Sequence, residues 1–324
     1  MPRLQSTSES DDFILLSGRS NTKLAEKIAK ILKVTVDEPI SSFSDGEIRV
    51  RITQNLRRRI VFVIQPTSPP VNDNIMELIF MIDAAKRASA REIIAVLPYY
   101  GYSRQDRKEM SRVPISASAV ASMIDHAGAD RILTVDIHSE QQEGSIQKPW
   151  DNLYGSYSLL PAIKARKLSQ LVIAAPDKGG MLRATGYARL LHAKGVAIVY
   201  KERDIAVNNV SEALDMIGDV KGKDVLLVDD MIDTAGTIVN AANYLKKSGA
   251  RSVRAATTHG LFSGRAMEKI NASAIEEIFI TDTIALPEKI VKNPKITVVT
   301  VAPLLAEAIK RIRTGESISK DLIL

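Results

Sequence analysis

The residues best suited to chemistry are acidic, hydroxyl and small side chains in the second half of the chain. Asp229 and Asp230 come directly after the predicted strand Asp224–Val228, and a short loop then leads into a helical pattern. Backbone N–H groups in such a loop and at the start of the helix bind a phosphate group. Hydroxyl side chains add donors, and glycine allows close approach to the backbone. The predicted loop residues are Asp233, Thr234, Ala235, Gly236 and Thr237.

The two acids beside this loop indicate what else the ligand carries. Carboxylates repel a bare phosphate, but they suit hydroxyl groups or a bound divalent cation. A sugar phosphate meets this demand, with its phosphate in the loop and its hydroxyls on Asp229 and Asp230. An Asp/Thr helix cap would explain one or two of these residues but not the whole set. The sequence has no Gly-x-x-x-x-Gly-Lys-Ser/Thr loop, which excludes a P-loop nucleotide site.

Three further polar segments follow predicted strands. Arg104 and Gln105 could hold triphosphate oxygens or an adenine edge, or belong to an ordinary surface loop. A carboxylate at Asp177, just before a pair of glycines, suits a hard cation that keeps several waters. His138 also ends an apolar strand, where a lone histidine is more often structural.

Two other segments have plain interpretations when they are taken alone. Asp45, Gly46 and Glu47 are typical of a hairpin turn. Lys201 and Arg203 stand two residues apart after a predicted strand, and a charge cluster in such a loop is usually solvated.

Short apolar runs alternate with helical patterns along the chain, which predicts a doubly wound α/β architecture. The runs are almost continuously apolar, as in a parallel sheet covered on both faces. The predicted strands are Ile60–Gln65, Ile93–Leu97, Arg131–Val135, Leu171–Ala175, Ala197–Tyr200, Asp224–Val228, Ser252–Thr257, Glu277–Ile280 and Ile296–Thr300. The predicted helices are Asn74–Ala88, Ser116–Ala127, Gly179–Ala193, Thr237–Ser248 and Ala302–Arg313.

A weak internal repeat indicates two related halves. Ala90–Val96 resembles Ala250–Ala256, and each segment follows an amphipathic helix. We expect a frayed tail over 1–12, an N-terminal domain over 13–150 and a C-terminal domain over 151–324, whose last helix packs back on the first domain. The helix Asn74–Ala88 is apolar nearly all round, which predicts either a core helix or burial at a subunit interface.

Composition excludes several classes of protein. The 324 residues predict two domains at roughly 150 residues each. Cysteine is absent, which excludes disulfides, thiolate metal sites and a cysteine nucleophile. The net charge of +6 is scattered and aromatic residues make up only 5%, so nucleic acid is not an expected partner. No apolar run approaches a membrane span and the N-terminus lacks the order of a secretory signal, so we expect a cytoplasmic protein with no membrane partner.

Several segments in order resemble the ribose-phosphate diphosphokinase family, the phosphoribosyl pyrophosphate synthetases. The stretch Val225–Thr237 is similar to the 5-phosphoribosyl 1-diphosphate motif, which this family shares with phosphoribosyltransferases. The resemblance runs from about Leu16 to Ser319 and covers nearly the whole chain. The other segments that carry it are Phe43–Glu47, Asn72–Leu78, Tyr102–Arg107, Asp136–Ser139, Pro176–Gly180 and Lys201–Arg203.

This resemblance implies a fold, a reaction and a set of partners. The fold would be two phosphoribosyltransferase-like domains, each a mostly parallel sheet with helices on both faces. The reaction would move the diphosphoryl group of ATP to the 1-hydroxyl of ribose 5-phosphate, giving 5-phosphoribosyl 1-diphosphate and AMP for nucleotide biosynthesis. It would require Mg²⁺, in a homo-oligomer that is built from dimers, as in a hexamer.

The resemblance also implies roles for individual residues. Lys201 and Arg203 would be the catalytic pair on a mobile loop, and His138 and Asp177 would organise Mg²⁺. Lys178 stands where relatives often have a small or apolar residue, and it adds a cation beside Asp177. The residues implied for ATP are Phe43, Asp45, Gly46, Glu47, Arg104 and Gln105, and the turn of Asp45, Gly46 and Glu47 would reach the adenosine part from a neighbouring subunit. Those implied for ribose 5-phosphate are Arg203, Asp229, Asp230, Asp233, Thr234, Ala235, Gly236 and Thr237.

Two alternatives remain on the same fold. A non-catalytic regulatory subunit would usually show a damaged loop, and the intact Lys201 and Arg203 argue against it. A phosphoribosyltransferase that uses a nucleobase has one such domain, whereas the sequence indicates two.

Overall fold

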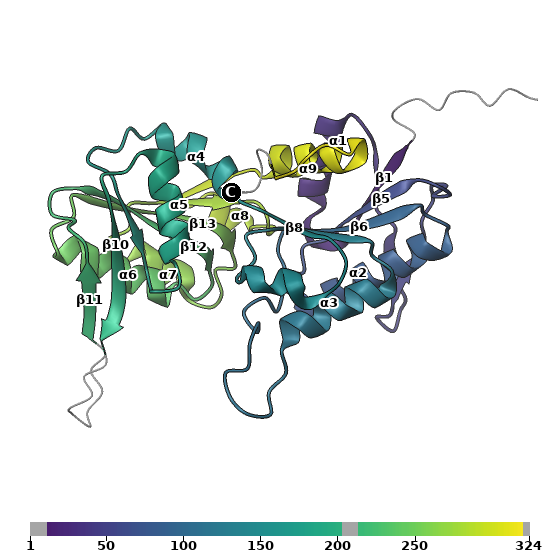
Figure 1. Ribbon diagram of the computed structural model, residues 1–324, viewed down its shortest axis with the longest axis horizontal. Helices are drawn as coiled ribbons and strands as arrows, with labels where there is room; N and C mark the ends of the chain where they lie inside the picture. The colour runs from purple at the N-terminus through teal and green to yellow at the C-terminus, as the bar shows by residue number, and fades with distance from the viewer. Residues whose placement is uncertain (1–11, 203–212, 320–324) are drawn as a thin grey trace, which may run out of the picture. The chain divides into compact units, whose positions relative to one another are not determined.

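A computed structural model describes residues 12–202 and 213–319, which divide into two compact units (Figure 1). The first unit takes in the described residues up to 154, with 283–285 and 300–319. The second takes in the described residues of 155–282, with 286–299. The division falls after strand β8 (Trp150–Leu153), which completes the first sheet, so the expected boundary at 150 lies slightly early. The C-terminal helix α9 (Ala302–Thr314) belongs to the first unit.

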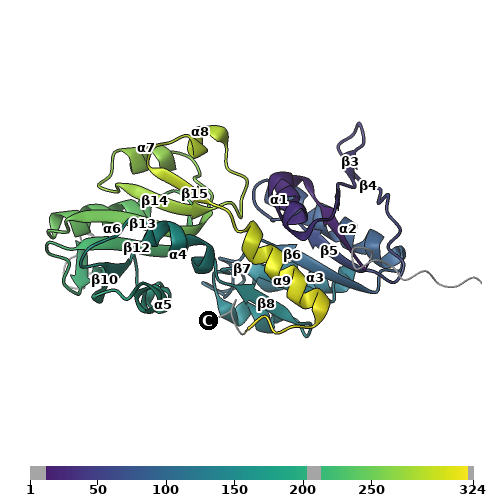
Figure 2. The ribbon, with the colours of Figure 1, turned by 90° about the horizontal axis from the view of Figure 1, so that it is seen from above.

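The first unit is built on a six-stranded sheet in the order β2-β1-β5-β6-β7-β8, in which every pairing is parallel. Its central strands are buried, which explains their nearly continuous apolar sequence. Helices α2 and α3 pack on one face, and α1 and α9 lie side by side on the other (Figures 1 and 2). The remaining bounds are β1 Phe13–Ser17, β2 Val36–Asp37, β5 Ile60–Ile64, β6 Glu92–Leu97, β7 Arg131–Val135, α1 Thr22–Leu32, α2 Val71–Arg87 and α3 Ser116–Ala127.

The second unit contains a seven-stranded sheet in the order β11-β10-β9-β12-β13-β14-β15. All pairings are parallel except that of β11, which runs antiparallel to β10 at one edge. Helices α4 and α5 pack on one face, and α6 and α7 on the other. The bounds are β9 Val172–Ala175, β10 Gly195–Glu202, β11 Ala213–Ile217, β12 Asp224–Ile232, β13 Ser252–Gly260, β14 Glu277–Thr281, β15 Ile296–Val299, α4 Ser156–Lys164, α5 Met181–Leu191, α6 Gly236–Lys247, α7 Ala266–Asn271 and α8 Glu288–Val291.

The predicted internal repeat is confirmed in the backbone. β5-α2-β6 in the first unit and β12-α6-β13 in the second have the same order, and their strands pair in the same parallel way. The N–H of Arg58 donates to the carbonyl of Ser89 at 3.0 Å, and that of Gly222 donates to Gly249 at 2.8 Å. All four residues have a positive φ. The two units therefore share one supersecondary design.

Two expectations about individual elements need correction or completion. β12 does not end at Val228 but runs on to Ile232, because its backbone continues to pair with β13 as far as Gly260. Helix α2 buries one side in the core, while Met76 and Phe80 are 36% and 40% exposed in the single chain. The core interpretation thus accounts for only part of its apolar surface, and the subunit interface stays a prediction.

Candidate active site

Three adjacent parallel strands bring the predicted groups of the second unit to one edge of its sheet. Ala175 of β9 pairs with Ile198 of β10, and Ala174 pairs with Leu227 of β12. β9 ends at Ala175, so Asp177 follows it by two residues, while β10 and β12 on either side run on past this point. Ligands of open α/β sheets bind at this carboxyl edge. The site predicted from the sequence therefore has the location that the fold favours.

Asp229 and Asp230 lie within β12 itself, and Arg183 of α5 faces both of them. One guanidinium nitrogen of Arg183, Nη1, is 3.6 Å from Oδ1 of Asp229 and 3.9 Å from Oδ1 of Asp230. Asp230 is buried and Asp229 is partly buried. One cation thus partly balances two neighbouring carboxylates, which leaves the cluster with a net negative charge.

This crowding changes the acidity of Asp229. Burial of its carboxyl group raises the pKa of Asp229 well above the usual aspartate value, and the charge and hydrogen bond of Asp230 raise it further. Arg183 acts in the opposite direction, and Asp177 adds a smaller upward shift. A ligand that brings hydroxyl donors to these oxygens would stabilise the charged form.

We expect Asp229→Asn to stabilise the protein and to weaken its activity. The folded state holds a proton on Asp229 more tightly than the unfolded chain does, so stability falls as the pH rises from the unfolded pKa through the raised folded one. Asparagine removes this loss, and above that window Tm should rise by about 2–4 °C for each kcal/mol gained. Thermal unfolding from about pH 3, below the pKa of an unfolded aspartate, to about pH 8 measures the effect.

Two further results would distinguish a changed ionisation of Asp229 from a general change in stability. The gain in Tm should vanish at low pH, where both the folded and the unfolded wild-type protein carry the proton. The kcat/KM for the sugar phosphate should fall by about tenfold or more, because the amide replaces one acceptor by a donor. A variant that is less stable than wild type at pH 8 contradicts the proposed protonation.

The predicted phosphate loop joins β12 to α6. Ala235 caps the helix with a positive φ of 60° and has no side-chain oxygen that could accept from the first N–H groups. Thr234 and Thr237 are exposed at its rim, and the ammonium of Lys269 donates to the carbonyl of Thr234 at 3.0 Å. The hydrogen bond from Lys269 thus holds the loop in place. The start of the helix has the free N–H donors that bind phosphate.

The contribution of Gly236 is the absence of a side chain and not a special backbone conformation. The left-handed backbone of the loop is at Ala235, whereas Gly236 begins the helix with no positive φ. A Cβ built on Gly236 would meet nothing within 4 Å. Glycine therefore keeps space open in front of the helix N-terminus, where an anion would lie.

The predicted catalytic pair is only partly described. The backbone of Lys201 belongs to β10 and pairs with Leu214 of β11, one residue past Tyr200 at the carboxyl edge. Arg203 lies outside the described residues. The strand therefore brings the backbone of Lys201 to the same edge as Asp177 and β12.

In the first unit, the segments that contain Arg104 and His138 are tied together. The N–H of Gln105 donates to the carbonyl of Tyr102 at 2.8 Å, and its side-chain oxygen accepts from Ser116 at 2.6 Å. Gln142, in the short helix after His138, donates to the carbonyl of Ser103 at 2.8 Å. The exposed side chains of Arg104 and His138 thus come from two neighbouring, hydrogen-bonded turns at the carboxyl ends of β6 and β7.

The predicted hairpin is confirmed, and it stands out from the rest of its unit (Figure 2). β3 (Ile40–Ser42) and β4 (Ile48–Val50) pair antiparallel, and the N–H of Phe43 donates to the carbonyl of Glu47 at 2.9 Å. Gly46 has a φ of 93°, which the turn requires. The Phe43 ring is 50% exposed, with the Arg49 guanidinium 5.7 Å from its centroid. The tip thus presents an aromatic face and two carboxylates, those of Asp45 and Glu47, to solvent.

The predicted ligands Asp177 and His138 differ in how well their donor atoms suit Mg²⁺. Within 12–202 and 213–319, no group of three or more His, Asp or Glu residues comes together as a metal site. Mg²⁺ does not need one, because it is held by one or two carboxylates together with waters and substrate phosphates. Asp177 fits this pattern, with its Oδ1 accepting from the N–H of Gly180 at 3.1 Å and its side chain exposed. His138 fits less well as a direct ligand, because Mg²⁺ prefers oxygen.

Arg183 is the residue of this cluster that the sequence analysis missed. A signal for it exists in the sequence, because an arginine in the first turn of a helix opposes the helix dipole and therefore needs a compensating anion. The anions are Asp229 and Asp230, which lie 46 and 47 residues away along the chain. Only the fold brings them together.

Comparisons with known proteins agree along nearly the whole chain. The model of the N-terminal domain of ribose phosphate pyrophosphokinase matches residues 13–128, and that of the phosphoribosyl synthetase-associated domain matches residues 204–322. The ribose-phosphate pyrophosphokinase of Vibrio cholerae is 47% identical over 310 residues, which are 95% of this chain and 98% of its own. That of Shewanella oneidensis is 48% identical with the same coverage. The crystal structure of phosphoribosylpyrophosphate synthetase from Mycobacterium smegmatis superimposes with a TM-score of 0.88 at 37% identity, over 94% of this chain and 100% of that one.

Proposed function

The chain belongs to the ribose-phosphate pyrophosphokinase family, and we propose a division of labour among its residues for making 5-phosphoribosyl 1-diphosphate. The enzyme moves the β,γ-diphosphoryl group of ATP to the 1-hydroxyl of ribose 5-phosphate and releases AMP. The relatives match both halves of the chain, which favours this reaction over that of a one-domain phosphoribosyltransferase. The observation that carries the proposal is the carboxyl edge of the second sheet, where an open helix N-terminus lies next to two acids.

Ribose 5-phosphate binds along β12 and the loop that follows it. Its phosphate accepts hydrogen bonds from the N–H groups at the start of α6, in the space that Gly236 leaves open, and from Thr234 and Thr237. Its ring hydroxyls donate to Asp229 and Asp230, whose crowded carboxylates gain from each added donor. The other predicted members of the loop, Asp233 and Ala235, shape the turn. Arg203 contacts the same substrate.

ATP binds through groups of the first unit. The exposed ring of Phe43 stacks on the adenine base, and the hairpin carboxylates and Gly46 contact the nucleoside. Arg104 and Gln105, which lie next to the turn of His138, hold triphosphate oxygens or the adenine edge. The residues of the hairpin tip that take part are Phe43, Asp45, Gly46 and Glu47.

Mg²⁺ is the cofactor, with Asp177 as its protein ligand and His138 as an orienting group. When bound, the cation neutralises the charge on the phosphates and fixes their geometry. The chain's own contribution to diphosphoryl transfer is positioning and charge stabilisation. Lys201 and Arg203 neutralise negative charge on the group in transit, while Asp229 and Asp230 hold the sugar so that its 1-hydroxyl faces that group.

Membership of this family also suggests an oligomeric state and a cellular location for the enzyme. We expect a homo-oligomer that is built from dimers, as in a hexamer, and that works in the cytoplasm. The exposed Met76 and Phe80 of α2 are consistent with such a contact. In the part of the chain that the structure describes, no helix has the length and apolar content to cross a membrane.

We expect Phe43→Ala to raise the KM for ATP by about tenfold or more, because stacking on an aromatic ring contributes about 1–3 kcal/mol per base. The KM for ribose 5-phosphate should stay the same. The experiment follows AMP formation from ATP, Mg²⁺ and ribose 5-phosphate by the purified protein.

Ile31→Ala is the matched control, since Ile31 is 47% exposed on α1 and has no proposed role. Phe43→Ala should leave Tm unchanged because its ring is already half exposed. Wild-type AMP formation that does not depend on the sugar would contradict the proposed reaction. An unchanged KM for ATP in Phe43→Ala would contradict only the role of the hairpin.

A further inference from the structure

Arg19 follows the carboxyl end of β1 in the first unit, and its guanidinium contacts two other elements at once. Nε donates to Oε1 of Glu77 on α2 at 2.6 Å, and Nη1 donates to Oγ of Ser42 on β3 at 3.0 Å. The side chain of Arg19 is half exposed, whereas that of Glu77 is buried. One guanidinium therefore connects a buried carboxylate of the core to the hairpin that carries Phe43.

The buried end of this connection is held in one geometry. Oε2 of Glu77 accepts from the backbone N–H of Arg19 at 3.0 Å and from the side-chain amide of Gln65 at 2.9 Å. The oxygen of that amide accepts from the hydroxyl of Ser20 at 2.7 Å. Gly18 leaves the space for Gln65, since a Cβ built on Gly18 would overlap its side chain. The carboxylate thus has three donors, and the guanidinium of Arg19 has a fixed partner.

The exposed end of the connection lies close to the tip of the hairpin. Ile40 and Val50 pair with each other at the base of the hairpin and pack against the core of the unit. Ser42 is the last residue of β3 and directly precedes Phe43. The hydroxyl that Arg19 holds is thus one residue away from the ring, beyond the part of the hairpin that the core already supports.

We propose that Arg19 is a positioning residue, which ties Ser42 to the buried Glu77 and so fixes the orientation in which Phe43 meets the adenine base. The proposal rests on the proposed function, since it assumes that Phe43 stacks on adenine. Stacking gains from a ring that is oriented before the base arrives, because ordering the hairpin during binding costs conformational entropy. Arginine suits this role because its planar fork makes two directed contacts from one side chain.

Amide hydrogen exchange of the purified protein tests the positioning step without turnover. The N–H of Phe43 bonds to the carbonyl of Glu47, so its exchange rate reports on opening of the hairpin. Ser42→Ala removes only the hydroxyl and should speed this exchange by about tenfold, as expected for one lost hydrogen bond to a charged group. Arg19→Lys keeps the charge that Glu77 needs but replaces the fork by a single nitrogen, and it should have the same effect. Exchange within β5 and β6 should stay unchanged in both variants.

Ligand measurements then connect the hairpin to the base. Both variants should raise the KM for ATP by about three- to tenfold, up to the loss expected when one stacking contact is removed, and leave the KM for ribose 5-phosphate unchanged. The Kd for inorganic triphosphate, from calorimetric titration with Mg²⁺ present, should also stay unchanged, because this probe carries no base. A purely structural role would not separate ATP from triphosphate. In a Phe43→Ala background, Arg19→Lys should add little to the KM for ATP, because both changes act through one contact.

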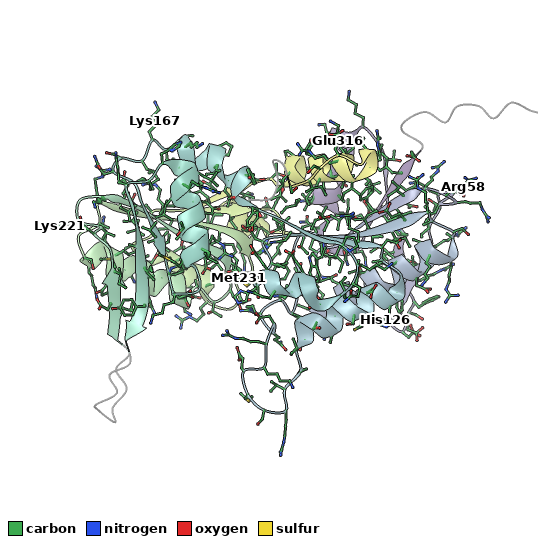
Figure 3. The ribbon with its side chains drawn as sticks, in the orientation of Figure 1. Arg58, His126, Lys167, Lys221, Met231 and Glu316 are labelled. Carbon is green, nitrogen blue, oxygen red and sulfur yellow. The ribbon has the colours of Figure 1, made fainter. Side chains whose placement is uncertain are left out.

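Arg58→Lys and Ser41→Ala are the matched controls, and both should behave like wild type. Arg58 is an exposed arginine of the same unit, and Figure 3 shows it at the surface. Ser41 is exposed and precedes Ser42 in β3, so its side chain lies on the opposite face of the strand.

Three results would overturn the positioning role of Arg19. The first is hairpin exchange in Arg19→Lys and Ser42→Ala that equals that of the controls. The second is faster exchange throughout the unit together with a lower Tm, since that indicates general structural damage. The third is faster exchange of the hairpin with an unchanged KM for ATP, or full additivity with Phe43→Ala. Wild-type protein that forms no AMP would contradict the proposed function instead, and hydrogen exchange would still show whether Arg19 holds the hairpin.

Discussion

Replacing Lys201 by alanine is expected to lower kcat by about 10³-fold or more, the range found when a positioned cation is removed from a phosphoryl-transfer site. Little covalent chemistry is required of the protein in this reaction, so loss of a group that stabilises charge has a large effect. The KM for ribose 5-phosphate should change little, because the sugar binds mainly along β12. Single-turnover formation of AMP measures the chemical step directly.

Lys194→Ala is the appropriate control for this variant. Lys194 is exposed and precedes the same strand, β10, at its opposite end. It should retain wild-type kcat. A Lys201→Ala enzyme with kcat within about tenfold of wild type would exclude a central catalytic role for this lysine.

Gly236→Val is expected to raise the KM for ribose 5-phosphate by about 100-fold or more, the equivalent of losing two hydrogen bonds to a charged phosphate. In the free protein the new side chain meets open space, so folding should not suffer. Valine is also no worse than glycine in a helix, which argues against a lower Tm. The substituent would instead occupy the place of the phosphate. Steady-state kinetics and calorimetric titration with ribose 5-phosphate both measure this loss.

Gly195→Val provides the matched substitution. Gly195 starts β10, and a Cβ there also meets nothing within 4 Å. This variant should bind ribose 5-phosphate like wild type. If both variants bind the sugar phosphate normally, the phosphate does not lie in front of α6, and the proposed substrate site is wrong.

Much of the fold could be predicted because each strand and helix has a local signal. β7 and α3 have the same bounds as the predicted Arg131–Val135 and Ser116–Ala127. Strand ends were harder to place when polar residues continue a paired strand. Asp229 and Asp230 suggest the end of a strand by their type, yet backbone pairing with β13 carries β12 past them. The apolar composition of a segment predicts that its strand is buried, whereas backbone pairing with the neighbouring strand determines where the strand ends.

The site could be predicted only as far as its residues cluster in the sequence. The phosphate loop and the hairpin are continuous segments, and the structure shows both as distinct local elements. The contacts of Arg183 with β12 and of Lys178 with Tyr200 depend on the order of strands in the sheet. The sequence does not identify the partners in either contact, because they are joined only by the fold.

Among the described residues, the two copies of the β-α-β unit differ at the position where β12 carries Asp229. Aligning the two copies through Arg58 and Gly222 puts Gln65 in the place of Asp229. Gln65 donates to the carboxylate of Glu77 at 2.9 Å, and Glu77, only 2% exposed, also accepts from the backbone N–H of Arg19 at 3.0 Å.

In the first copy, the side chain at this position thus bonds to a buried carboxylate from the second turn of α2, while in the second copy Asp229 faces Arg183 and the start of α6 stays open. The two copies of the scaffold are therefore asymmetric: this position is used for an internal contact in the first copy, and it lies beside an open helix start in the second. Duplication of this kind lets a single chain present two different surfaces from one folding plan, because the same strand position serves an internal hydrogen bond in one copy and an accessible carboxylate in the other.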